Sequence, residues 1–230
     1  MSILANISNI LFDLDGTLTD PRKGITRCIQ YALKRSGMAV PPSEQLIWCI
    51  GPPLKNAFSN LMDTRDDIIL ERAVRYYRER FAEKGIFENS LYTGVVTSLG
   101  KLRSVGYRLY LSTSKPKVFA KQILDHFNLT PFFHTVYGSE LDGRWSEKGE
   151  LIAYIIDQEN LHREATLMVG DRIHDIDGGK ENGVMTAAVS YGFGTRDEIV
   201  ASGPDIVFET IEELTTKMLS VRLEQTNHHL

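Results

Sequence analysis

The sequence predicts an α/β fold: a doubly wound parallel sheet with a helical domain inserted into it. Two observations lead to this prediction. Along most of the 230 residues, short apolar runs typical of buried strands alternate with amphipathic helical stretches, and such alternation indicates a parallel sheet covered by helices on both faces. The alternation breaks once, after the first strand, where about 65 residues carry helical patterns only.

Five apolar runs have the length and composition of buried strands. They are Ile7–Leu14, Tyr107–Ser112, Thr166–Gly170, Val184–Val189 and Asp205–Phe208. Between these runs, apolar residues recur at helical spacing in three stripes. The stripes are Val95, Leu99 and Leu102, then Phe119, Ile123 and Phe127, and then Leu151, Ile152, Ile155 and Ile156. The helices that carry them are expected to cover the sheet.

The stretch that interrupts the alternation contains three predicted helices. They cover Ile25–Leu33, Glu44–Ile50 and Asp66–Ala82, and Pro-rich turns at 41–42 and 51–53 separate them. We therefore expect a separate helical domain over residues 19–85. The remainder, residues 1–18 and 86–230, is expected to form the core domain that holds the sheet.

Composition and charge limit the partners and the cellular location that we expect for the chain. The chain has 26 basic and 30 acidic residues and a formal net charge of −4, so it lacks the basic face that nucleic acid would require. No apolar stretch approaches the roughly 18 residues of a membrane span. The start of the chain has no signal-peptide pattern, and two cysteines are too few for a disulfide framework. We expect a cytoplasmic protein with no nucleic-acid or membrane partner; the oligomeric state stays open.

Acidic and hydroxyl side chains directly follow three of the predicted strands. They are Asp13 and Asp15 after the first, Thr113 and Ser114 after the second, and Asp171 and Asp175 after the third. Ligands of open α/β sheets bind just beyond the carboxyl ends of the strands. The three groups are therefore expected to meet at one edge of the sheet, and this convergence is the strongest functional signal in the sequence.

Each of these groups also has a plain structural interpretation. Asp15 and Gly16 form a common turn pair, Thr113 and Ser114 suit the start of a helix, and residues 170–175 suit a turn that leads into a helix. Lys148, which precedes the helix that begins near Leu151, would by itself be an ordinary surface lysine. Three such coincidences at one sheet edge are improbable.

The electrostatics of four clustered carboxylates call for positive charge. Asp13, Asp15, Asp171 and Asp175 would repel one another in a partly desolvated site. A divalent cation and one lysine, Lys148, would relieve that repulsion. Carboxylate oxygens favour Mg²⁺ over zinc, which prefers nitrogen and sulfur ligands.

These residues resemble the four motifs of the haloacid dehalogenase superfamily of phosphatases. The motifs are Asp-Leu-Asp-Gly-Thr at 13–17, Thr113, Lys148, and Gly-Asp-x-x-x-Asp at 170–175, in the family's order. The helical insertion is similar to the family's cap domain, and the core would then be Rossmann-like. Residues 114–116, 51–54 and 191–194 are similar to the phosphoglycolate-phosphatase-like branch, which also contains 5′-nucleotidase-like members. The resemblance covers the chain to about residue 219.

The resemblance implies a role for each motif residue. Asp13 would be the nucleophile that forms an aspartyl-phosphate, and Asp15 would be the general acid and base. Mg²⁺ would be held by the carboxylates of Asp13 and Asp171 and by the backbone carbonyl of Asp15. The substrate would be a small phosphorylated metabolite such as 2-phosphoglycolate, or a nucleoside 5′-monophosphate.

The same resemblance implies the supporting and substrate-binding residues. Thr113, Ser114 and Lys148 would bind the phosphoryl oxygens, and Asp175 would support the metal ligands or pair with Lys148. In the cap, Arg22, Lys23 and Lys55 are candidate substrate contacts, although each also suits a solvated surface position. Arg172 departs from the family pattern, in which a small residue is common, and its role is open.

Several alternative functions stay open on the sequence. A dehalogenase would need neither the second acid, Asp15, nor a metal, and a phosphomutase of the superfamily would use the same four motifs. A receiver-like phosphoryl-accepting module also combines acids with a lysine, but such a module is about half this length and has no inserted domain. A catalytically inactive binding protein would not need the intact motif positions.

Overall fold

The chain forms a six-stranded parallel sheet at the centre of a three-layer α/β structure, which confirms the predicted fold class. The computed structural model describes residues 3–227. The strands follow the spatial order β5 (Thr135–Ser139), β4 (Arg108–Pro116), β1 (Asn9–Phe12), β6 (Thr166–Gly170), β7 (Met185–Val189) and β8 (Ile206–Phe208). Because β1 lies between β4 and β6, the carboxyl ends of these three strands are adjacent.

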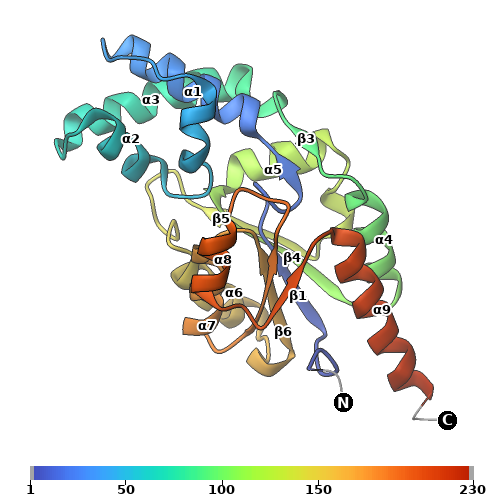
Figure 1. Cartoon of the computed structure of the whole chain (residues 1–230). Helices are drawn as coiled ribbons and strands as arrows, with labels where there is room; N and C mark the ends of the chain where they lie inside the picture. Colours follow the sequence, from blue (N-terminus) through green and yellow to red (C-terminus); the bar gives the residue numbers. More distant parts are fainter. Residues whose placement is uncertain (1–2, 228–230) are drawn as a thin grey trace.

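Helices cover both faces of the sheet (Figure 1). One face packs against α4 (Val95–Ser104), α5 (Lys117–His126) and α9 (Ile211–Asn227), and the other against α6 (Lys148–Glu159), α7 (Ile173–Glu181) and α8 (Arg196–Ser202). Strand β1 contributes side chains to both faces of the sheet, since Ile10 and Phe12 belong to one apolar cluster and Leu11 belongs to the other. Side chains that alternate between two covered faces explain why three consecutive residues of this strand, Ile10 to Phe12, are apolar.

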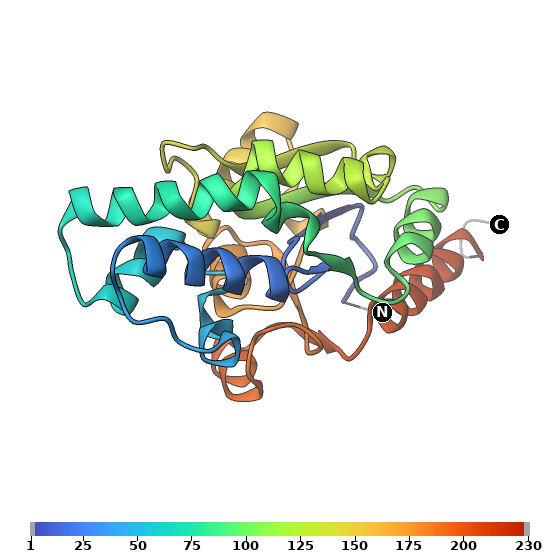
Figure 2. The same cartoon turned by 90° about the horizontal axis from the view of Figure 1, so that it is seen from above.

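A group of helices is inserted between β1 and α4, and we call residues 22–87 the helical segment. It comprises α1 (Arg22–Arg35), the 3₁₀ helix η1 (Ser43–Cys49), α2 (Leu54–Met62), α3 (Asp67–Glu83) and the 3₁₀ helix η2 (Gly85–Phe87). The chain enters and leaves it through β2 (Thr19–Asp20) and β3 (Ser90–Leu91), which pair antiparallel. Figure 2 shows α1 and α3 running alongside each other beyond the sheet.

The apolar core of the helical segment is continuous with that of the sheet domain. Phe81 of α3 contacts Phe119 of α5 edge-to-face, with ring centroids 5.3 Å apart. Phe58 and Leu70 of the segment belong to the same buried cluster as Ile10 and Phe12 of β1. The division of the chain into domains at residues 19–85 stays a prediction.

Several elements differ from the sequence-based expectations, since β2, β3, α8 and α9 were also not predicted. Strand β5 was not predicted, because Thr135–Ser139 contains only two large apolar side chains. The expected helix at Glu44–Ile50 is instead the 3₁₀ helix η1. Helix α2 was not predicted, since it is only nine residues long and follows two prolines. Two further 3₁₀ turns, η3 (Thr130–Phe132) and η4 (Arg163–Ala165), precede β5 and β6.

The described helices include none with the length and apolar character needed to cross a bilayer.

Candidate active site

The structure brings the predicted motif residues together at the carboxyl edge of the sheet. Asp13 follows β1, Thr113 lies near the end of β4, and Asp171 follows β6. The backbone N–H of Asp13 donates to the carbonyl of Val169 at 2.9 Å, which extends the pairing of β1 with β6 up to the site. The position of each acid is therefore set by its strand.

Lys148 is a buried cation at the centre of the acid cluster. Its Nζ atom lies 2.8 Å from Oδ1 of Asp13 and 2.8 Å from Oδ1 of Asp175. It also donates to the carbonyl of Ser112 at 2.8 Å. Lys148 is the first residue of α6, where the helix dipole disfavours a cation. The two carboxylates stabilise the cation at this position. Burial would lower the pKa of Lys148, but Asp13 and Asp175 raise it.

Asp15 pairs with a second buried lysine, Lys115. The Nζ atom of Lys115 lies 2.5 Å from Oδ2 of Asp15, and Thr19 Oγ1 lies 3.5 Å from Oδ1. Gly16 separates Asp15 from the rest of the motif and has a φ of +90°. A Cβ atom at Gly16 would lie 2.1 Å from Oδ2 of Asp171, so only glycine permits the close approach of the two acidic loops.

Asp171 and Asp175 complete the acid cluster, and one of their oxygens is left without a partner. The N–H of Phe193 donates to Oδ2 of Asp171 at 2.6 Å, and the N–H of Arg172 donates to Oδ2 of Asp175 at 3.1 Å. Oδ1 of Asp171 is buried and has no hydrogen-bond partner among the residues that the structure describes. Such an atom indicates a missing ligand.

Burial and mutual repulsion perturb these carboxyl groups. Burial, with the charges of Asp175 and Asp13 added, raises the pKa of Asp171 well above 3.8. Burial also raises the pKa of Asp15 and of Asp175, although Lys115 and Lys148 respectively oppose the increase. Three acidic groups with raised pKa values at one sheet edge are typical of a functional site.

The donor set fits a hard divalent cation. Ligand oxygens of Asp13, Asp171 and Asp175 lie within 4.8 Å of one another. Asp175 is already engaged by Lys148 and by the N–H of Arg172, whereas Asp171 has the unpartnered oxygen. All of these donors are carboxylate oxygens, which suit Mg²⁺. The arrangement favours Asp13 and Asp171 as ligands and Asp175 as their support.

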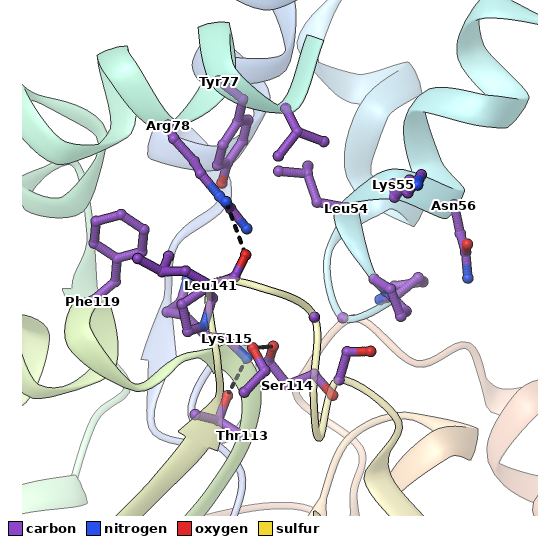
Figure 3. A pocket seen from close by; sticks show the side chains of 18 of the residues that line it. Leu54, Lys55, Asn56, Tyr77, Arg78, Thr113, Ser114, Lys115, Phe119 and Leu141 are labelled. Atoms are coloured by element: carbon purple, nitrogen blue, oxygen red, sulfur yellow. Dashed lines mark hydrogen bonds between the residues drawn. The ribbon is translucent and has the colours of Figure 1, made fainter. Parts of the chain in front are cut away.

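A cavity of about 960 Å³ lies between the acid cluster and the helical segment. Asp13, Asp15, Lys148 and Asp175 line its floor, whereas Asp171 is not among the described residues that line it. Figure 3 shows Leu54, Tyr77 and Arg78 of the segment across the cavity from Thr113, Ser114 and Lys115. The cavity therefore joins the acids to a wall that the helical segment supplies.

Thr113 and Ser114 line this cavity instead of capping a helix. The hydroxyl of Thr113 accepts from the N–H of Lys115 at 3.3 Å, and the carbonyl of Ser114 accepts from the hydroxyl of Ser139 at 2.8 Å. Helix α5 begins after Pro116 without a side-chain cap. The helix-start interpretation of these hydroxyls is therefore wrong.

The three candidate contacts in the helical segment have different positions. Lys55 lines the cavity, but its ammonium group pairs with Asp67 at 3.0 Å and Glu71 at 3.6 Å. Arg22 pairs with Asp20 at 3.4 Å, and Lys23 is exposed. Neither Arg22 nor Lys23 is among the described residues that line the cavity.

Sequence reasoning assigned no role to Lys115 or Arg78 of the cavity and left the role of Arg172 open. Lys115 pairs with Asp15, Arg78 of α3 donates to the carbonyl of Leu141 at 3.2 Å, and Arg172 pairs with Glu198 at 2.8 Å. Lys115 could have been found from its place two residues after Thr113. The contacts of the two arginines bridge segments far apart in the chain, and no local pattern signals them.

Comparison with known proteins agrees with the geometry. The family model of haloacid dehalogenase-like hydrolases matches residues 10–189, which include every motif residue of the site. The chain belongs to this family. The resemblance inferred from the four motifs is thereby confirmed.

Relatives of this chain include proteins named as a nucleotidase, a kinase and a phosphatase. A 5′-nucleotidase of Pseudomonas aeruginosa is 48% identical over 85% of this chain and 88% of its own length. Tyrosine-protein kinase PtkA of Mycobacterium tuberculosis is 35% identical over 89% of this chain and 70% of its own. A phosphoglycolate phosphatase of Salmonella choleraesuis is 28% identical over 93% of both chains.

Solved structures agree with this assignment. A predicted phosphatase from Clostridium acetobutylicum superposes with a TM-score of 0.89 at 38% identity, over 93% of this chain and 99% of that one. A putative phosphatase from Clostridium difficile is 42% identical with a TM-score of 0.82, over 93% of this chain and 99% of that one. The chain is a hydrolase of the haloacid dehalogenase-like family, and its structural neighbours include proteins named as phosphatases.

Proposed function

We propose that the chain is a Mg²⁺-dependent phosphomonoesterase that acts through an aspartyl-phosphate at Asp13. The observation that carries the proposal is the arrangement around Asp13. Lys148 binds Oδ1 of Asp13, and no described residue makes a hydrogen bond or ion pair with Oδ2. The carboxylate is therefore oriented by one oxygen and leaves the other for attack on phosphorus.

The first half of the reaction transfers the phosphoryl group to the protein. Oδ2 of Asp13 forms a bond to phosphorus as the bond between phosphorus and the ester oxygen breaks. Asp15, which lines the same cavity, gives its proton to the departing oxygen and releases the alcohol. Burial raises the pKa of Asp15, against the effect of Lys115, and a raised pKa suits a carboxyl group that must carry a proton.

The second half of the reaction restores Asp13. Asp15, now ionised, takes a proton from water as the water oxygen bonds to phosphorus. The bond between phosphorus and Oδ2 of Asp13 breaks, and inorganic phosphate leaves. Thr113, Ser114 and Lys148 bind the phosphoryl oxygens in both halves. Asp13, Asp171 and the backbone carbonyl of Asp15 would hold Mg²⁺, which would supply charge neutralisation when bound. Asp175 supports this arrangement through its ion pair with Lys148.

The favoured substrates are nucleoside 5′-monophosphates. The 5′-nucleotidase relative is 48% identical, whereas the phosphoglycolate phosphatase relative is 28% identical. The cavity volume of about 960 Å³ also suits a drug-sized ligand better than phosphoglycolate. Apolar side chains such as Leu54, Val74 and Phe119 line it, and these can contact a base or a ribose. Phosphoglycolate is the second candidate.

The experiment is phosphate release in the presence of Mg²⁺ across a panel of phosphomonoesters. The panel holds nucleoside 5′-monophosphates, the matching 3′-monophosphates, phosphoglycolate and sugar phosphates, with Asp13→Asn as control. A kcat/KM preference for 5′-monophosphates supports the proposal, and a preference for phosphoglycolate reverses the choice of substrate. Stable phosphorylation of the protein without phosphate release would contradict the hydrolase mechanism. Isomerisation of a sugar phosphate would instead indicate a mutase.

A further inference from the structure

Arg172 joins three separate parts of the structure through one side chain. It lies in the loop after β6, between Asp171 and Asp175. Its Nε atom donates to Oε1 of Glu198 in α8 at 2.8 Å, and its NH1 group donates to the carbonyl of Ile50 in the helical segment. The Arg172 side chain is only 12% exposed, so these two contacts are shielded from solvent.

The turn from Ile50 to Pro53 leaves space for the guanidinium group of Arg172. Gly51 has a φ of +107°, and a Cβ atom there would lie 3.1 Å from both Cγ and NH1 of Arg172. Pro52 and Pro53 follow, and their fixed φ angles stiffen the chain as it enters α2. The turn from Ile50 to Pro53 is therefore a rigid element with its carbonyl presented to Arg172.

The backbone N–H of Arg172 also makes a hydrogen bond to the acid cluster. Its N–H donates to Oδ2 of Asp175 at 3.1 Å, and Oδ1 of Asp175 lies 2.8 Å from Nζ of Lys148. Lys148 in turn binds Asp13. Arg172 thus contacts the Ile50–Pro53 turn through its side chain, and through its backbone N–H it is connected to the nucleophile by way of Asp175 and Lys148.

We propose that Arg172 is a positioning residue that fixes the Ile50–Pro53 turn over the acid cluster. By doing so it holds Leu54 and Lys55, which directly follow the turn, at the wall of the cavity. Glu198 orients the guanidinium group and neutralises it, so Arg172 does not act as a free phosphate ligand. Its effect on substrate binding rests on the proposed function, whereas its effect on the turn does not.

The test combines hydrogen exchange of the protein alone with steady-state kinetics. Arg172→Gln removes the charge and both contacts. Glu198→Gln keeps an oxygen that can accept from Arg172 and from the N–H of Ile173, and it removes only the charge. Arg163→Gln is the control, because NH1 of Arg163 also donates to a backbone carbonyl, that of Asn182, at 2.5 Å, but at an exposed position away from the helical segment.

In Arg172→Gln we expect amide exchange across residues 46–58 to rise about ten-fold, since a hydrogen bond from a charged donor is broken. KM for the best phosphomonoester should rise about ten-fold with kcat within about three-fold, because a wall of the binding site is loosened while the acids stay in place. Glu198→Gln should shift both quantities in the same direction but less. Arg163→Gln should change neither.

Unchanged exchange over 46–58 in Arg172→Gln would overturn the proposal. A raised KM without faster exchange would also overturn it, because Arg172 would then contact the substrate directly. If Arg172→Gln does not fold, Glu198→Gln decides by the same two measurements. Faster exchange in a protein that releases phosphate from no substrate would support the role of Arg172 in fixing the Ile50–Pro53 turn and contradict the proposed function.

Discussion

The ammonium group of Lys148 lies 2.8 Å from the carboxylate of Asp13, although 135 residues separate them in the chain. The same ammonium group lies 2.8 Å from Asp175. Both carboxylates are buried, so the lysine supplies the counter-charge that offsets the cost of burying them.

Replacing Lys148 by alanine is expected to lower both stability and activity. The variant leaves two buried carboxylates without their cation, and the loss of one partner of a buried ion pair costs about 3–5 kcal/mol. Denaturant unfolding measures the loss. Lys121→Ala, on the exposed side of α5, is the control and should stay within about 0.5 kcal/mol of the wild type. Equal stability of the two variants would mean that Lys148 does not neutralise the cluster.

Asp13→Asn is expected to reduce phosphate release by at least about a thousand-fold, because an amide cannot serve as the nucleophile. The substitution keeps the shape of the side chain and removes one of several repelling charges, so the melting temperature should not fall. Steady-state rates and thermal unfolding check the two parts. The exposed Asp177→Asn is the matched control. Turnover near the wild-type rate in Asp13→Asn would rule out the aspartyl-phosphate mechanism.

Asp15→Asn is expected to slow phosphoryl transfer more strongly when the substrate has a poorer leaving group. Loss of general acid catalysis typically lowers a rate about 10²–10⁴-fold. The full loss should be seen with alkyl phosphates such as nucleotides. With 4-nitrophenyl phosphate, whose leaving group needs no proton, the loss of kcat/KM, which reports the phosphoryl-transfer half, should be far smaller. An equal loss of kcat/KM with both substrates would contradict the role of Asp15 as general acid.

Chelation by EDTA is expected to abolish activity, and added Mg²⁺ should restore it. Mg²⁺ should also raise the melting temperature of the wild type, because an ion that binds only the folded protein stabilises it by mass action. Asp171→Asn should weaken both effects, since the unpartnered oxygen of Asp171 is lost as a ligand. Activity that is indifferent to chelation would instead favour a dehalogenase-type site.

The ion pairs of Glu88 predict a pH-dependent contribution to stability. Oε1 of Glu88 lies 2.6 Å from Arg27 of α1, and Oε2 lies 2.8 Å from Arg80 of α3. Burial would raise the pKa of Glu88, but hydrogen bonds from Arg80 and Arg27 outweigh it and lower the pKa from 4.5. A lowered pKa in the folded state stabilises the protein above the unfolded pKa, and this contribution is lost as the pH falls through the folded value.

Glu88→Gln should therefore be less stable than the wild type by about 1–2 kcal/mol at pH 7. The difference should shrink as the pH falls below 4.5, the ordinary pKa of a glutamate. Denaturant unfolding at several pH values measures it. Glu79→Gln is the control, because the Arg35–Glu79 pair is exposed and 3.5 Å long and should contribute little at any pH. A gap that stays constant with pH would contradict the assignment.

Sequence alone determined the sheet and the set of acidic residues. Strands β1 and β6 each contain an apolar run, and they end directly before Asp13 and Asp171. Parallel strands place their carboxyl ends at one edge. Local pattern and this topological rule were therefore sufficient to gather the acids with Thr113. Strand β5 escaped prediction, because it lies at the edge of the sheet and carries few apolar residues.

Only the tertiary structure decided which lysine or arginine side chain pairs with which carboxylate or carbonyl group. Asp15 pairs with Lys115, Asp13 and Asp175 share Lys148, and Arg172 reaches a backbone carbonyl 122 residues away. Each pairing depends on the direction of a long side chain and on how the helical segment packs over the sheet. Residue spacing carries no information about either, since charged side chains at a fixed strand end can turn toward several partners of similar distance.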